Sequence, residues 1–69
     1  MKQLKQLKDI TTGTKFWIDR GFGPEELTAV IDAREIPSSP GLWMVGVTNF
    51  DGRHDYVRTV PTHEIQIRS

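Results

Sequence analysis

The chain has 69 residues, nine of them basic and nine acidic, so its formal net charge at pH 7 is zero. This length supports one hydrophobic core and one domain, residues 1–69, because a chain of this size buries only about 60% of its unfolded surface. The neutral charge excludes a strong overall field for nucleic acid, and the absence of cysteine excludes disulfides and favours a reducing, cytoplasmic setting.

The first predicted element is an amphipathic segment over residues 1–12. Lys-Gln-Leu repeats with a period of three over residues 2–8, which places Leu4 and Leu7 on one side. This pattern fits a short helix weakly, and one or two helical turns are not stable alone. Whether helical or extended, the segment must dock on the rest of the domain or fray. It has no long apolar stretch, so we expect neither export nor membrane insertion.

From residue 14 onward apolar and polar residues alternate with a period of two, which indicates half-buried strands. Strands are predicted over residues 15–19, 27–34 and 64–68, and alternation turns Trp17 outward. The side chains predicted to face the core are Phe16, Ile18, Leu27, Ala29, Ile31, Ala33, Ile65 and Ile67.

Two further strands, 42–49 and 54–60, flank Asp51-Gly52, the favoured pair for a two-residue hairpin turn. Opposed residues share a face in such a hairpin. The inner face is then predicted to hold Trp43, Val45, Val47, Tyr56 and Val60, and the outer face Leu42, Met44, Gly46 and Val57. Arg58 faces inward in this register, opposite Val45. Either its guanidinium reaches water at the barrel mouth, or the turn is longer and the register different.

The order of these parts resembles an SH3-like barrel over residues 14–68. Val60-Pro61-Thr62-His63-Glu64-Ile65 is similar to the hydrophobic-Pro-x-x-x-hydrophobic segment that closes eukaryotic SH3 domains, and Leu42-Trp43-Met44-Val45 is similar to their paired-Trp strand. The resemblance implies a mainly β, five-stranded barrel with a 3₁₀ turn at residues 60–64 before the last strand. Leu42 replaces the first Trp of that pair, so recognition of PxxP peptides does not carry over. Barrels of this kind also occur in short bacterial and phage proteins, which is the origin that we expect.

No constellation of residues specifies catalysis. Asp51-x-x-His54-Asp55 is the best metal candidate, but its residues alternate between faces and fit a polar hairpin tip. His63-Glu64 lacks a nucleophile or a large pocket and reads as the polar cap of a turn. We therefore predict no catalytic residue, no metal and no cofactor.

The strongest functional prediction is a protein-contact patch for a partner protein or a second copy. Trp17 points away from the core and Phe22 stands between two glycines in a loop, so both are candidate anchors, as exposed aromatic residues often are. Met44 and Val57 complete the predicted patch. The other reading is that Leu4, Leu7 and Ile10 fold back over Trp17 and cover it.

The alternative function is nucleic-acid binding through the basic N-terminal part, with Trp17 stacking on a base. Its candidate residues are Lys2, Lys5, Lys8, Lys15 and Arg20. A solvated cationic face explains the same residues, because the net charge is zero. We predict a small, non-enzymatic binding module, with no membrane contact and no small-molecule substrate.

Overall fold

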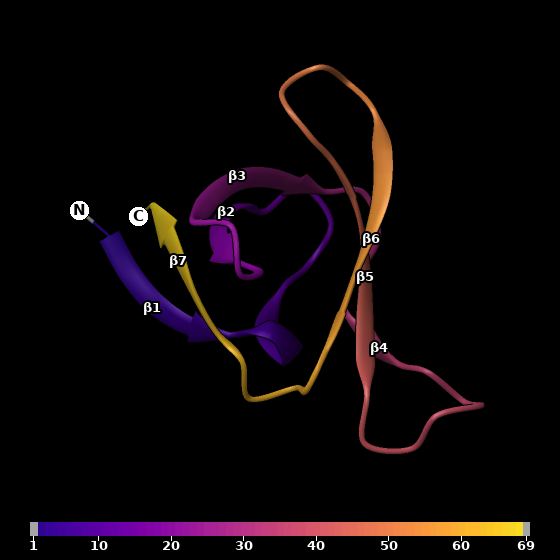
Figure 1. Ribbon diagram of the computed structural model, residues 1–69. Helices are drawn as coiled ribbons and strands as arrows, with labels where there is room; N and C mark the ends of the chain where they lie inside the picture. Colours follow the sequence, from indigo (N-terminus) through magenta and orange to yellow (C-terminus); the bar gives the residue numbers. More distant parts are fainter. Residues whose placement is uncertain (1, 69) are drawn as a thin grey trace.

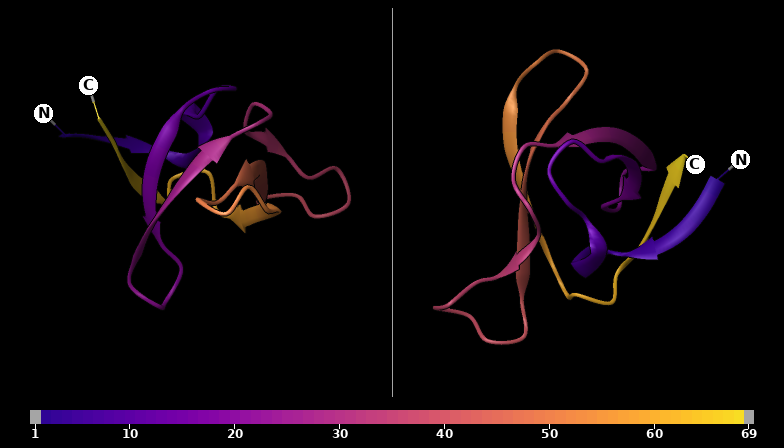
Figure 2. Two further views of the ribbon diagram at one scale, coloured as in Figure 1. Left: turned by 90° about the horizontal axis from the view of Figure 1, so that it is seen from above. Right: turned by 180° about the vertical axis from the view of Figure 1, so that it is seen from behind.

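Seven antiparallel strands form one curled sheet in the computed structural model, which describes residues 2–68 (Figure 1). The strands are β1 (Lys2–Gln6), β2 (Lys15–Asp19), β3 (Pro24–Ala29), β4 (Arg34–Glu35), β5 (Trp43–Thr48), β6 (His54–Thr59) and β7 (Glu64–Arg68), and η1 (Leu7–Asp9) is a 3₁₀ helix. Their order is β1-β7-β2-β3-β5-β4, and β6 also pairs with β5. The sheet curls into a half-barrel, and β1 and β7 bring the two chain ends together (Figure 2).

The core fills the concave side of this sheet. Strand alternation is confirmed in β2, where Phe16 and Ile18 are buried on either side of the half-buried Trp17. It is also confirmed in β7, where Ile65 is buried. The buried hydrophobic side chains are Leu7, Ile10, Phe16, Ile18, Leu27, Ala29, Val45, Val47, Val57 and Ile65.

Of the two forms predicted for the N-terminal segment, the extended one is confirmed for residues 2–6, and the helical one is reduced to the single 3₁₀ turn of η1. The strand pairs with β7 over its whole length, with Leu4 opposite Gln66. The η1 turn then places Leu7 in the core, held by hydrogen bonds from the Leu7 N–H to the His63 C=O (2.9 Å) and from the Lys8 N–H to the Pro61 C=O (3.1 Å). A ladder with β7 satisfies more backbone groups than two helical turns could.

The strand predicted over residues 27–34 breaks after Ala29. The Ala33 N–H donates to the Ile10 C=O at 3.0 Å, and the Asp32 carboxylate accepts from the Thr12 N–H at 2.7 Å. These bonds draw residues 30–33 toward the N-terminal segment and interrupt the period of two. Ala33 still packs against the core, but Ile31 does not join it, which corrects its predicted placement.

The β5–β6 hairpin has a loop one residue longer than the predicted two-residue turn, because the loop begins at residue 50 rather than 51. The Asn49 N–H donates to the Arg53 C=O (3.1 Å), and the Asn49 side-chain oxygen accepts from the N–H groups of Asp51 and Arg53 (2.9 and 3.0 Å). Residues 50–52 therefore form a three-residue loop. Gly52 adopts φ 79°, a conformation that favours glycine, as expected in such a loop.

This longer loop changes the hairpin register by one residue. Val45 pairs with Val57 and Val47 with Asp55. A shift of one residue moves every side chain of the strand to the other face. The prediction that Val57 lies outside is wrong, since it is 1% exposed, and Tyr56 and Val60 are exposed rather than in the core. Arg58 is exposed on the outer face, so the alternative of a longer turn with a different register is confirmed.

The segment before β7 is a single turn closed by one i→i+3 hydrogen bond, from the His63 N–H to the Val60 C=O at 3.2 Å, as the prediction of one 3₁₀ turn requires. The turn is not extended into a 3₁₀ helix; within residues 2–68 that element is η1, which hydrogen-bonds to the same turn.

Candidate functional site

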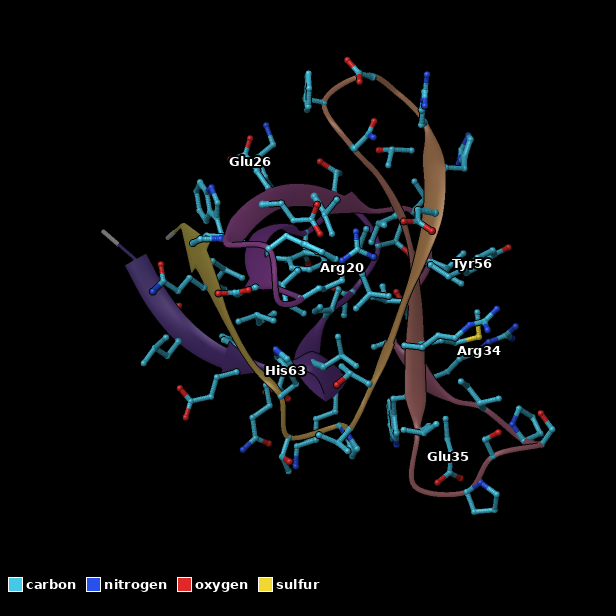
Figure 3. The ribbon with its side chains drawn as sticks, in the orientation of Figure 1. Arg20, Glu26, Arg34, Glu35, Tyr56 and His63 are labelled. Atoms are coloured by element: carbon cyan, nitrogen blue, oxygen red, sulfur yellow. The ribbon has the colours of Figure 1, made fainter. Side chains whose placement is uncertain are left out.

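Four of the seven exposed large hydrophobic side chains in residues 2–68 gather on the outer side of β5 and β6. They are Val30 (40% exposed), Leu42 (40%), Tyr56 (53%) and Val60 (46%). Figure 3 shows Tyr56 and Arg34 pointing outward on the same side of these strands. We call this surface the hairpin face and define it by Val30, Ile31, Arg34, Leu42, Met44, Tyr56, Arg58 and Val60.

The register explains why these residues meet. Met44 on β5 lies opposite Arg34 on β4 and opposite Arg58 on β6, which makes a row across three strands. Tyr56 lies in the next row, opposite Gly46. Opposed residues of an antiparallel pair share a face, and this face alternates with the buried Val45 and Val57.

Gly46 allows residues 30 and 31 to close over the centre of this face. An added Cβ at Gly46 would lie 3.0 Å from Ile31 Cγ1 and 3.5 Å from Val30 Cγ2. The Val30 N–H also donates to the Gly46 C=O at 2.8 Å. The two branched side chains therefore rest on the β5 backbone next to Tyr56, where a larger residue than glycine would displace them.

The hairpin face carries two cations and no acidic residue. Arg34 and Arg58 are exposed, and neither forms an ion pair within the described residues. The nearby carboxylates of Asp32 and Asp55 take their hydrogen bonds from other residues. Hydrogen bonds from the N–H and hydroxyl of Thr12 hold the pKa of Asp32 below its ordinary value. The N–H of Tyr56, and more weakly Arg20 and Arg58, do the same for the pKa of Asp55.

The four predicted protein-contact residues do not form one patch. Met44 is half-buried on the hairpin face, whereas Val57 belongs to the core. Trp17 lies on β2, which β3 separates from β5, and is half-buried between Gln66 and Glu26 in the register. Phe22 is 97% exposed at the tip of the loop between β2 and β3.

That loop holds Phe22 outward through its own hydrogen bonds. The Asp19 carboxylate accepts from the N–H groups of Gly21 (2.7 Å) and Gly23 (3.2 Å), and both glycines have positive φ. The phenylalanine is therefore displayed by a defined loop, but on a different element from the hairpin face.

The N-terminal segment covers Trp17 only in part. Leu7 and Ile10 enter the main core instead. Leu4, 66% exposed, lies across Gln66 from Trp17, and the two side chains line one cavity of about 210 Å³. The second small core weighed from the sequence is thus reduced to this shallow contact region.

The predicted nucleic-acid residues are spread over both sides of the sheet. Lys5 lies opposite the inward-facing Ile65, whereas Lys15 alternates with the buried Phe16 and faces outward. Lys8 is exposed on η1, and the Lys2 side chain lies outside the described residues.

Arg20 is the exception among these cations, because it has acidic partners. Its Nε pairs with Glu25 Oε1 and its Nη1 lies 3.4 Å from Asp55 Oδ2, which raises its pKa. Arg20 therefore joins the loop after β2 to β6, and part of its charge is neutralised there.

Sequence reasoning predicts part of the hairpin face, since it places Leu42 and Met44 outside. It puts Tyr56 and Val60 in the core and does not group the two arginines, because a two-residue turn gives the wrong register. One signal pointed to the error: an arginine at position 58 facing inward is costly unless it is paired. Asn49, whose side chain closes the longer loop, was the residue to weigh against Asp51-Gly52.

The described residues contain no group of three or more His, Cys, Asp or Glu side chains able to hold a metal ion. His63 Nδ1 lies 3.1 Å from the hydroxyl of Thr59, a contact between the turn before β7 and the last residue of β6. Over residues 2–68 there is also no helix of the length and apolar character needed to span a membrane. No protein-family model, curated protein or solved structure matches this chain.

Proposed function

We propose that this chain is a small SH3-like barrel that acts as a non-enzymatic protein-binding module. After β1, its five longer strands are β2, β3, β5, β6 and β7, which matches the number of strands in that fold. In this interpretation β1 is a strand added to the barrel beside β7. The short strand β4 follows β3 and pairs with the same edge of β5. Fold alone says little about activity, so the proposal depends on the hairpin face.

The observation that carries the proposal is the composition of the hairpin face. Tyrosine, methionine and arginine are enriched at the centres of protein interfaces, whereas lysine and acidic residues are depleted there. The face contains Tyr56, Met44 and two arginines, with neither lysine nor a carboxylate among its eight residues. Tyr56 is the proposed anchor, because its ring is half exposed beside the branched side chains of Val30 and Ile31.

The charge of the face defines the partner that it fits. Two exposed guanidinium groups that form no ion pair within the described residues favour a protein segment in which carboxylates flank a large apolar side chain, since arginine binds carboxylates with two parallel hydrogen bonds. Two copies of the chain docked through this face would bring like charges together. The proposed partner is therefore a different, acidic protein segment rather than a second copy.

Nucleic-acid binding remains the alternative function. The spread of Lys5, Lys8 and Lys15 over different elements and faces, and the pairing of Arg20, make a continuous phosphate track harder to form from the basic N-terminal part. The hairpin face has a single aromatic ring for stacking, whereas surfaces that bind single-stranded nucleic acid use several. These points favour protein as the partner class.

A displayed library of random peptides provides the test. We expect panning on the immobilised chain to enrich peptides that combine Asp or Glu with aromatic or branched residues. Fluorescence polarisation then measures the selected peptides. Tyr56→Ala should weaken their binding roughly tenfold or more, as loss of an interface anchor does. Arg34→Glu and Arg58→Glu should also weaken binding of the acidic peptides, and more strongly at low salt than at high salt.

Lys15→Glu is the matched control, because it reverses an exposed cation outside the hairpin face. It should leave the affinity unchanged. Selected peptides that bind equally well to Tyr56→Ala would refute the role of this face. Tight, salt-sensitive binding of a single-stranded oligonucleotide that is lost on reversing Lys5, Lys8 and Lys15 would instead support the alternative.

A further inference from the structure

The curled sheet has a long strand at each of its two ends. In residues 2–68, β1 pairs only with β7 and β6 pairs only with β5, so each of these two strands has one edge without a neighbouring strand. Such edges present backbone N–H and C=O groups that can pair with another chain. The two edges differ in whether these groups are already engaged.

The edge of β6 is closed at its centre. The Asn49 N–H bonds to the Arg53 C=O, so the odd-numbered residues of this strand point their backbone groups at β5 and the even-numbered ones point away. Tyr56 thus directs its N–H outward, where the Asp55 carboxylate accepts it at 2.8 Å. Asp55 is held there by Arg20 as well, at 3.4 Å. A strand added to β6 would have to displace this carboxylate.

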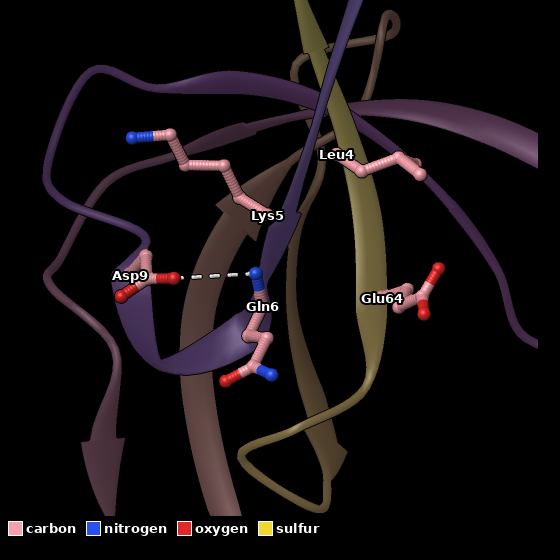
Figure 4. Close-up of a pocket in the computed structure, with 5 residues that line it drawn as sticks. All are labelled: Leu4, Lys5, Gln6, Asp9 and Glu64. Carbon is pink, nitrogen blue, oxygen red and sulfur yellow. Dashed lines mark hydrogen bonds between the residues drawn. The ribbon is translucent and has the colours of Figure 1, made fainter.

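The edge of β1 is open at its centre. The Leu7 N–H donates to the His63 C=O on the β7 side, so alternation turns the N–H and C=O of Leu4 and Gln6 toward the outer edge. The Gln6 N–H confirms this direction, because it donates to Asp9 Oδ2 at 3.3 Å (Figure 4). Leu4 has no such capping residue within the described part of the chain, and its side chain is 66% exposed.

We propose that β1 pairs through this edge with β1 of a second copy, antiparallel and two-fold symmetric about Leu4. The two Leu4 residues then exchange their outward N–H and C=O groups and bring their exposed side chains together. Each sheet continues through the interface into the other. This surface is distinct from the hairpin face, and the inference does not depend on the proposed function.

The sequence of β1 is self-complementary in this register. Pairing about Leu4 puts Lys5 opposite Gln3 of the second copy and Lys2 opposite Gln6, so no lysine meets a lysine. A shift by one residue would lose this match and would place opposite faces side by side.

Single-cysteine variants test the register, since the natural chain contains no cysteine. In a hydrogen-bonded antiparallel pair, opposed Cα atoms lie about 5.5 Å apart, within disulfide range. Leu4→Cys should therefore form a disulfide-linked dimer in a glutathione redox buffer. Gln3→Cys is the matched control: it is exposed and adjacent, but its two copies are diagonal rather than opposed. We expect roughly tenfold or more linked dimer for Leu4→Cys, because pairing raises its effective concentration.

Sedimentation equilibrium of the unmodified chain provides the second measurement. The average mass should rise from one chain toward two as the concentration increases. Leu4→Pro should stay monomeric, because it removes an N–H that faces the outer edge of β1 and has no capping residue within residues 2–68. Leu4→Thr keeps that N–H and should retain association.

Two outcomes would overturn the proposal: equal disulfide formation by the two cysteine variants, or an unmodified chain that is monomeric at all concentrations. Neither would affect the hairpin-face proposal. Conversely, Arg34→Glu should leave the average mass unchanged, so the two proposals fail independently.

Discussion

Replacing Val57 and Tyr56 separately by alanine tests the hairpin register from which the hairpin face follows. The two residues are neighbours on β6, so both substitutions remove a good strand former from the same strand. Val57 is 1% exposed and Tyr56 is 53% exposed. In the register predicted from a two-residue turn these environments are reversed, with the tyrosine inside.

The expected magnitude follows from the buried volume. Val57→Ala removes two buried carbon groups, at about 0.8 kcal/mol each, and leaves a small cavity, so we expect a loss of about 2 kcal/mol in the free energy of unfolding. In a domain of this size that loss lowers Tm by roughly 8–16 °C. Tyr56→Ala should cost less than about 1 kcal/mol, because half of the side chain already contacts water.

Urea unfolding followed by the fluorescence of the two tryptophans measures both effects. The midpoint should fall clearly for Val57→Ala and little for Tyr56→Ala, with the slope of the transition unchanged in both. A larger loss for Tyr56→Ala than for Val57→Ala would refute the observed register and, with it, the hairpin face.

Three further predictions concern residues whose environment the structure defines. The pKa of Asp32 is held below 3.8 by Thr12, so the ionised carboxylate stabilises the fold above that pH and its contribution is lost as pH falls through the lowered value. Asp32→Asn should therefore reduce the drop in Tm between pH 7 and pH 3, and an unchanged drop would contradict the bond to Thr12. Gly52→Ala should cost about 1 kcal/mol in urea unfolding, because φ is 79° there, whereas Gly52→Asn should cost less. Phe22→Ser should change the free energy of unfolding by no more than about 0.5 kcal/mol, since the ring is 97% exposed. A larger loss of stability would mean that the ring packs on the domain.

The candidate site shows where prediction from sequence succeeded and where it failed. Alternation in β2 and β7 correctly identified Phe16, Ile18 and Ile65 as buried, because the period of a strand is a local property. The same reasoning failed on β6, where the alternation of Tyr56 and Val57 fits either face. The choice there depended on one residue of loop length.

Two neighbouring signals competed for that loop. Asp51-Gly52 favours the shorter turn, and Asn49 closes the longer one by accepting two backbone N–H groups. Burying Val57 stabilises the fold, and burying an unpaired Arg58 would be costly, so both favour the register that the longer loop gives. Packing across the whole sheet therefore decided the register.

The sequence by itself determined the class of the fold: mainly β, without disulfides, and with core residues spaced at the period of strands. Only the tertiary structure decided that residues 2–6 are a strand with an open edge and that Met44, Tyr56 and the two arginines share a face. The physical reason is that alternation specifies which residues lie together on a face, but not which face is buried. That choice depends on the partner strand, and partner strands come from distant parts of the chain.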